Sequence, residues 1–476
     1  RINKLSLVIS RDVIYHVYFL EVNMQKIIEN NKAFINTLLV IAVPVIIQNA
    51  ISIGLNMIDT VMVSSLGENA ISAVGLANRI YFIFTTICFG IYSGASIFVA
   101  QYWGAKDTES IKKVFGIDLI IGSVLAIVFS VTVFLFREQL LRIFINEADV
   151  IHLGSKYLKI IAVSYFFTAV SFAFSFNCRA IHKLNMPTAI SAVALCVNTF
   201  LNWILISGNL GFEAMGVEGA AIATLIARVV EFIALIYFIY RDKGHPLAGT
   251  FAELTSWDFS MLKKVMSTSV PVILSETAWS VGTSVYYIAY GFMGSYAIAV
   301  VQIAFTISDF FMTLFFGIGN ASAVMIGNEI GKNDVDTAMN YSRKFVKLTL
   351  FLSIVLSFLL FISRNAIIKF FNLEPETSVY LSKTLAVYSL YFTPKMFTYM
   401  FICGILRAGG DTRFCMFLDM VTIWLMGVPL SFFSVLVLHL PIHLVIAVVF
   451  SEEIIKMVII LKRYKSRKWL NNLIMD

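Results

Sequence analysis

Charged residues are scarce in this sequence, and their scarcity argues against a soluble protein. Only 14% of the 476 residues are charged, whereas soluble proteins contain roughly 25%. Apolar runs of about 20 residues recur along the chain, and each is long enough to cross a hydrocarbon core about 30 Å thick. With 59% hydrophobic residues and a mean hydropathy of +0.84, the composition indicates an integral membrane protein.

Cysteines and catalytic motifs are also few. The five cysteines are odd in number and form no C-x-x-C pair, so we expect neither a disulfide framework nor a zinc site. His439 and His443 have the spacing of a metal pair, but they flank Pro441 and lack a third ligand. No P-loop, HExxH or GxSxG motif is present. We therefore expect a protein that is not an enzyme and does not itself hydrolyse ATP.

Twelve apolar runs are predicted to form transmembrane helices. In lipid every backbone polar group must be paired within the protein, and a helix achieves this inside one segment. The ten-residue alternation of a transmembrane barrel is absent. The sequence thus predicts an all-α polytopic membrane protein with twelve transmembrane helices in two six-helix bundles. The predicted spans cover residues 35–63, 71–98, 115–136, 157–178, 187–207, 216–240, 268–292, 296–326, 345–362, 384–406, 413–438 and 441–461.

Positive charge predicts how these spans are oriented. The loops after even-numbered spans and the C-terminal tail carry far more Lys and Arg than the loops after odd-numbered spans. Both termini are therefore expected on the cytoplasmic side of a plasma (cell inner) membrane. Because the net charge of +7 sits largely in these short loops, we expect no nucleic-acid partner.

The chain divides into five predicted regions. Met24 resembles a natural start, so residues 1–23 are predicted to be an upstream extension. The regions are residues 1–34 (N-terminal extension and cytoplasmic lead), 35–240 (first lobe), 241–267 (cytoplasmic linker), 268–461 (second lobe) and 462–476 (basic cytoplasmic tail).

The two halves of the chain resemble each other at an offset of 227 residues. A second echo places Arg179-Ala180 opposite Arg407-Ala408, 228 residues later. An even number of spans per repeat means that both halves enter the membrane from the same side. They should then be related by an axis along the membrane normal, with a substrate cavity between them. The matching positions include Val43–Ile46 with Val270–Ile273, Gly67 with Gly294, Gly104 with Gly331 and Asp107 with Asp334.

A group of polar residues in the first half could bind a cation. Asp59 lies near the outer end of the first span, where a charged group costs at least about 2.5 kcal/mol. Asn198 and Asn202 share one face of the fifth span at i and i+4, and Thr224 lies in the sixth span. One carboxylate with amide and hydroxyl oxygens suits Na⁺, and the same carboxylate could carry H⁺ instead. A hydrogen-bonded structural role for Asp59 is the alternative.

Polar residues in the second half are candidates for substrate contact or gating. Glu276 follows Pro271 by five residues, Asp309 lies in the eighth span, and Tyr287 belongs to the aromatic residues that attract lipophilic cations. A structural role is the alternative for Glu276. Two charge pairs at i and i+3 are predicted to pair locally, or alternatively to face a polar cavity: Arg228 with Glu231, and Glu453 with Lys456.

Several segments of the sequence resemble the MATE (multidrug and toxic compound extrusion) transporters. The resemblance runs from about residue 30 to the C-terminus. It implies twelve helices in two V-shaped bundles and the export of drugs in exchange for Na⁺ or H⁺. The segments are Pro44, Asp59-Thr60, Gly94–Gln101, Gly104–Asp107, Gly219–Thr224 and Leu406–Thr412.

The resemblance also implies roles for individual residues. Asp59 is similar to the essential aspartate of the first helix, and Asn198 to its asparagine partner in the fifth. Asn202 departs from DinF-type members, which often have a second aspartate there. In NorM-type members the functional glutamate of the seventh helix falls about one turn after Glu276, and Lys395 lies near the position of their acid in the tenth helix.

Together these features predict secondary active efflux of lipophilic, often cationic compounds, in antiport with Na⁺ or H⁺ by alternating access. We expect a monomer in the lipid bilayer, with small-molecule drugs or toxins as partners and no cofactor besides the coupling ion. The alternative within the same superfamily is a flippase for a lipid-linked saccharide, which the twelve-helix count disfavours. A channel or a receptor is a different class: channels are commonly smaller oligomeric units with pore-loop signatures, and receptors rarely show an internal six-helix duplication.

Overall fold

The structure is a computed structural model that describes residues 32–51, 59, 62–63, 65–145, 147–369 and 375–475. These residues contain no β-strand, which confirms the predicted all-α class. Nine of the helices within the described ranges are long and apolar enough to cross a membrane. The predicted N-terminal extension, the Met24 start and Thr60 lie outside the described residues.

Helices of the first half match the first six predicted spans. Asp59 and residues 62–63 are also helical and belong to the first span. A short 3-10 turn, η1 (Asn209–Gly211), follows the fifth span. The helices are Lys32–Ile51, α2 (Glu68–Gly104), α3 (Thr108–Arg142), α4 (Ala148–Ala180), α5 (Asn185–Ser207) and α6 (Gly216–Arg241).

Helices of the second half match the other six spans, after the short linker helix α7 (Phe251–Leu254). The tenth and eleventh spans contain π-helical stretches, η2 to η4. The elements are α8 (Phe259–Gly291), α9 (Ser295–Gly331), α10 (Val335–Ile368), α11 (Pro375–Tyr399) with η2 (Met400–Leu406), α12 (Thr412–Thr422) with η3 (Ile423–Gly427), α13 (Val428–Phe432) and η4 (Phe433–Val437), and α14 (Ile442–Lys465).

The predicted repeat is visible in the local backbone. Gly67 and Gly294 precede α2 and α9 with φ values of 99° and 103°, a conformation that favours glycine. Asp107 and Asp334 cap α3 and α10 by accepting hydrogen bonds from backbone N–H groups at 3.0 and 2.9 Å. Equivalent turns and caps therefore start equivalent helices in the two halves.

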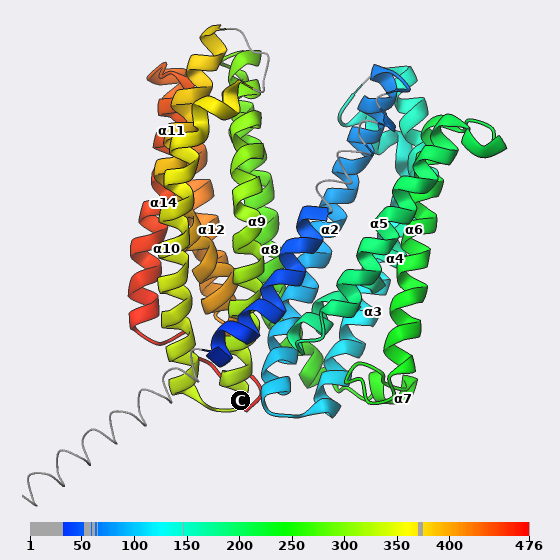
Figure 1. The fold of residues 1–476 in the computed structure, drawn as a ribbon, viewed down its shortest axis with the longest axis vertical. Helices are drawn as coiled ribbons and strands as arrows, with labels where there is room; N and C mark the ends of the chain where they lie inside the picture. The colour runs from blue at the N-terminus through cyan, green and yellow to red at the C-terminus, as the bar shows by residue number, and fades with distance from the viewer. Residues whose placement is uncertain are drawn as a thin grey trace, which may run out of the picture.

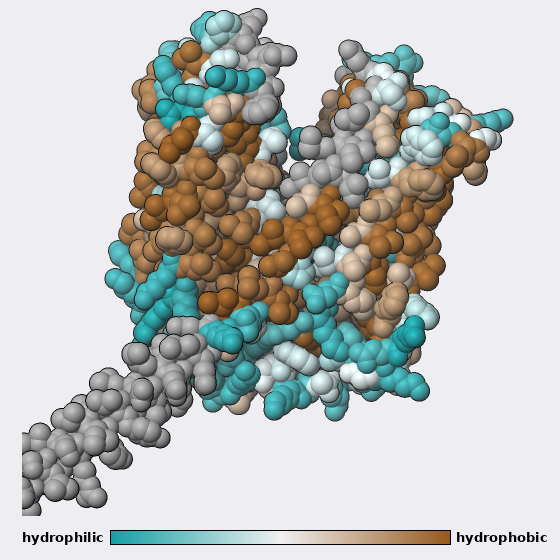
Figure 2. Space-filling view, viewed as in Figure 1, coloured by the Kyte–Doolittle hydropathy of each residue, from teal (hydrophilic) through white to brown (hydrophobic). Residues whose placement is uncertain are grey.

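The helices form two bundles that spread apart at one end (Figure 1). The first lobe contains α2 to α6, and the second contains α9 to α14. The two lobes meet at the end that carries α7 and the C-terminus, which we call the closed end. Figure 2 shows a notch between the lobes at the opposite end, and an apolar band between polar ends. Such a band is the surface that a lipid bilayer covers.

Two glycines bring α2 and α9 into backbone contact at the closed end. A Cβ atom on Gly104 would lie 1.9 Å from the carbonyl oxygen of Asn328, and one on Gly331 would lie 1.8 Å from that of Gln101. Gly104 and Gly331 are repeat-related, as are Gln101 and Asn328. The crossing therefore follows the repeat, and any side chain at either glycine would force the two helices apart.

The C-terminal tail forms hydrogen bonds at the same crossing of α2 and α9. The side chain of Gln101 donates to the carbonyl oxygens of Ala408 and Asn471, each at 3.2 Å, and accepts from the N–H of Leu473 at 2.8 Å. Asn472 donates to the carbonyl oxygen of Ile330 in α9 at 3.0 Å. The tail thus connects α2 of the first lobe to α9 of the second.

The first helix of each half also packs against a helix of the opposite lobe. A Cβ atom on Gly90 of α2 would lie 2.6 Å from the side chain of Ile273 in α8, and one on Gly317 of α9 would lie 2.5 Å from Ile46. These two contacts are repeat-related. Ser269 in α8 adds a hydrogen bond to the carbonyl oxygen of Ile91 at 3.3 Å. The first part of α8 therefore rests on α2, and α8 also packs on α12.

Candidate cation-binding site

Three helices of the first lobe bring together the four residues predicted to bind a cation. The amide of Asn202 in α5 donates to Oδ1 of Asp59 at 2.9 Å. With its amide nitrogen facing the first span, Asn198 donates to Oδ2 of Asp59 at 2.8 Å. The amide oxygen of Asn198 then accepts from the hydroxyl and the N–H of Thr224 in α6, each at 3.2 Å. Both carboxylate oxygens of Asp59 are thus held by α5.

One oxygen of this group has no hydrogen-bond donor among the described residues. Oδ1 of Asn202 is buried and unpartnered, although a buried amide oxygen is normally satisfied. The Asp59 carboxylate and the side-chain oxygens of Asn198, Asn202 and Thr224 are hard oxygen donors with one formal negative charge, although both amides here turn their N–H groups toward the carboxylate. This donor set fits a monovalent cation, or a proton on Asp59. The role of the four residues stays a prediction.

Two further residues adjoin this group. Tyr157 of α4 lies beside Thr224, and the Arg228 guanidinium exerts its field on Asp59. Arg228 pairs with Glu231 at 2.7 Å, and Ser191 of α5 donates to Glu231 at 2.6 Å. The local pairing predicted from the i, i+3 spacing is therefore present. Tyr157 was missed because a tyrosine in an apolar run carries no sequence signal of its own.

Glu276 lies elsewhere, at the contact between the two lobes where α2, α8, α9 and Arg407 meet, which we call the seam. Its carboxylate pairs with Arg407 at 2.9 Å, and Arg407 also donates to Ser93 of α2 at 3.0 Å. The repeat-related Arg179 reaches the other way, donating to Asn320 of α9 at 2.7 Å. Arg407 and Arg179 therefore each form a hydrogen bond with the opposite lobe, and Glu276 forms an ion pair with Arg407.

Tyr287 and Asp309, the other predicted substrate or gating residues, are not brought to Glu276 or to Asp59. The hydroxyl of Tyr287 donates to Gln302 at 3.4 Å. Asp309 lies in the field of Lys395, whose ammonium sits 6.0 and 5.8 Å from the ring centres of Phe305 and Phe450. The seven predicted site residues therefore form one group of four and three separate positions.

The second lobe contains an ionic network that the sequence revealed only in part. The ammonium of Lys456 lies 3.7, 3.7 and 3.8 Å from carboxylates of Asp419, Glu452 and Glu453. Hydrogen bonds at 2.7 and 3.1 Å add Ser275 to Asp419 and Tyr286 to Glu452. Spacing predicted the pair of Glu453 with Lys456, whereas Asp419 joins from another helix, α12.

Within the described ranges, no three His, Cys, Asp or Glu residues are grouped so as to hold a metal ion. The ring of His443 instead lies tilted against that of Tyr380, with ring centres 6.3 Å apart.

The MatE family model matches residues 44–204 and 271–433, which together make up more than half of the chain. The chain belongs to the MATE family. The two matched segments begin 227 residues apart, which is the offset of the internal repeat. This MATE protein is therefore a multi-pass membrane protein, and each of its halves fits the same family pattern.

Curated relatives and solved structures agree with this assignment. The probable multidrug resistance protein YoeA of Bacillus subtilis is 25% identical over 393 residues, covering 82% of this chain and 84% of that protein. The probable multidrug resistance protein NorM of Thermotoga maritima is 22% identical, covering 84% and 85%. A MOP superfamily transporter from Pyrococcus furiosus has the same fold, with a TM-score of 0.81 at 19% identity over 91% of this chain and 96% of that chain.

Proposed function

We propose that this MATE protein exports lipophilic, often cationic compounds in antiport with Na⁺ or H⁺. The observation that carries the proposal is the Asp59 carboxylate, which is held by Asn202 and Asn198 beside an unpartnered oxygen. A carboxylate within a transmembrane span is costly, and a bound cation would compensate its charge. The names of its relatives as multidrug resistance proteins support drugs as the cargo.

In this proposal the first span takes one position when the cation is bound and another when the drug is bound, so the two ligands exclude each other. When a cation binds Asp59, the amide oxygens of Asn198 and Asn202 turn toward it. When the cation leaves, the amide N–H groups of both residues donate to the carboxylate again, as they do in this structure. The lobes, residues 35–240 and 268–461 joined by the linker 241–267, rock about the seam to expose the cavity alternately to each side. The notch in Figure 2 then opens to the exterior, and both termini lie in the cytoplasm of a plasma membrane. The working unit is a monomer.

Transport into vesicles tests this function. The full chain is reconstituted in sealed vesicles, and uptake of a fluorescent lipophilic cation is followed under an imposed Na⁺ or H⁺ gradient. We expect uptake driven by one of the two gradients and abolished when that gradient is collapsed. Uptake that follows only the drug's own gradient contradicts antiport, and gradient-driven flux of a lipid-linked saccharide instead of the drug contradicts the cargo.

A further inference from the structure

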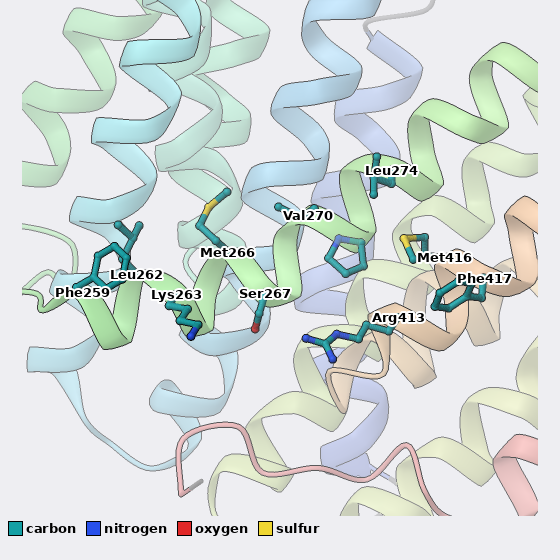
Figure 3. A pocket seen from close by; sticks show the side chains of 11 residues that line it. Phe259, Leu262, Lys263, Met266, Ser267, Val270, Leu274, Arg413, Met416 and Phe417 are labelled. Carbon is teal, nitrogen blue, oxygen red and sulfur yellow. The ribbon is translucent and has the colours of Figure 1, made fainter.

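An apolar groove of about 750 Å³ runs between α8 and α12 at the closed end of the molecule (Figure 3). One face of each helix lines it, because the lining residues recur every three or four positions. The apolar lining includes Leu262, Met266, Val270 and Leu274 of α8, and Met416 and Phe417 of α12. Phe417 is 62% exposed and Leu274 is 46% exposed, so the groove is open along its length.

Two basic side chains stand at one edge of this groove. In Figure 3 the side chain of Arg413 extends from α12 toward α8, and Lys263 lies on the same side of α8 as Ser267. Within the described part of the chain, neither Lys263 nor Arg413 forms an ion pair or a side-chain hydrogen bond. Pro271 cannot donate the backbone hydrogen bond that the Ser267 carbonyl, four residues earlier, would accept in a regular helix. The edge is therefore polar and positive.

We propose that this groove binds one anionic phospholipid. An acyl chain lies along the apolar faces of α8 and α12, and the phosphate meets Lys263 and Arg413. Both residues lie within two turns of the start of their helices, at the closed end of the molecule. Anionic headgroups attract basic residues at this level of the membrane. A lipophilic cation matches the apolar lining but is repelled by the two positive charges.

The basic pair is a feature of this half of the molecule alone. Under the repeat, Lys263 corresponds to Asn36 and Arg413 to Asn185, both exposed and uncharged. The fold builds equivalent helices in both halves, so packing does not require positive charge at these positions. Charge complementary to an anionic headgroup is the property that distinguishes them.

The groove also lies at the junction of the two lobes. Its α8 wall belongs to the segment that rests on α2, where Ser269 and Ile273 contact Gly94 and Gly90. Its α12 wall belongs to the second lobe. A lipid in the groove contacts both walls, so its occupancy depends on how α8, which packs on α2 as well as on α12, is positioned between the lobes. Lipid binding is thereby linked to conformation, and it does not depend on the identity of the exported compound.

Native mass spectrometry of the full chain in neutral detergent tests the proposal, with phosphatidylglycerol and phosphatidylcholine added at equal concentrations. We expect the chain to retain one phosphatidylglycerol more tightly than phosphatidylcholine. The double variant Lys263→Gln, Arg413→Gln should weaken phosphatidylglycerol binding by roughly fivefold for each charge removed. Its matched control, Lys264→Gln with Arg343→Gln, removes two exposed charges outside the groove and should leave the preference unchanged.

A second variant separates the groove from its charged edge. Ser267→Trp places an indole in the groove and keeps both charges, so it should reduce retention of both lipids if the acyl chain occupies the groove. Equal retention of the two lipids by the unmodified chain overturns the proposal, as does an equal loss in the control variant. Displacement of phosphatidylglycerol by millimolar inorganic phosphate, or unchanged binding in Ser267→Trp, indicates an anion site on the surface instead.

Discussion

The side chains of Asp59 and Asn202 are 143 residues apart in the sequence and are joined by a hydrogen bond of 2.9 Å. This bond ties the first span to α5, and Asn202 keeps its own amide oxygen free of donors within the described residues. The same asparagine thus orients the carboxylate and offers a ligand beside it. A change of charge at Asp59 must therefore be felt at the contact between these two helices.

Replacement of Asp59 with Asn should abolish gradient-driven export while leaving insertion and folding intact. The amide has nearly the shape of the carboxylate but carries no negative charge, so it can neither bind Na⁺ strongly nor carry a proton. The measurement is drug uptake into vesicles, with thermal unfolding in detergent as the check on folding. The control is Glu218→Gln, which removes a half-exposed acid that pairs with Lys156 at 3.1 Å, and it should retain uptake. Full activity of the Asp59 variant would end the coupling role.

Substitution of alanine at Gly104 or Gly331 should disrupt the closed end. Each added methyl group would overlap a backbone carbonyl of the opposite lobe, and overpacking of this kind costs about 1–3 kcal/mol or more. We expect a lower melting temperature and loss of transport in both variants. Gly75→Ala is the matched control on α2, because nothing lies within 4 Å of its added carbon. If all three variants behaved alike, the crossing would not require glycine.

Acid should loosen the closed end through His182. This loop residue contacts Asn328 of the second lobe, and burial, together with the Lys332 ammonium, lowers its pKa to about 4. Once the lobes separate and water reaches the ring, the pKa returns toward about 6.5. The open state then binds more protons between these values, so the contact is fully favourable above pH 6.5 and is lost as the pH falls toward 4.

A distance measurement between labels at Glu109 and Asp336 reports this opening. Both positions are exposed and repeat-related, in the first turns of α3 and α10 at the closed end. Lowering the pH from 7.5 to 5 should increase the population with the longer distance. His182→Asn, which tolerates the φ of 62° at this position, should remove most of the pH dependence. An unchanged pH profile in that variant would assign the effect to other groups.

Replacement of Glu276 with Gln should destabilise the seam. Arg407 is almost fully buried, with its side chain 5% exposed, and removal of one member of a buried pair costs on the order of 3 kcal/mol. The double variant Glu276→Gln, Arg407→Met removes both charges and should recover part of that loss. Thermal unfolding separates these outcomes. A stable Glu276→Gln protein with an altered drug spectrum would favour a substrate role over a structural one.

The sequence by itself determined the helices and their duplication. Hydropathy is a local property summed over about 20 residues, so twelve apolar runs predicted twelve helices before any contact was known. Gly67, Gly294, Asp107 and Asp334 stand at helix starts that their own backbone and side-chain chemistry dictates. The repeat offset followed from residue identity alone, and it placed the two lobes in the same orientation.

Only the tertiary structure decided which polar groups meet. The pairing of Glu276 with Arg407 and the contact of Lys456 with Asp419 join helices that are separated by long stretches of sequence. Such contacts depend on the rotation and tilt of each helix, which hydropathy does not specify because many rotations bury a similar apolar area. Asp59 could be matched in depth to Asn202, but the bond between them exists because α5 turns that face toward the first span. Hydropathy specifies which segments form helices, whereas packing determines which polar side chains contact one another.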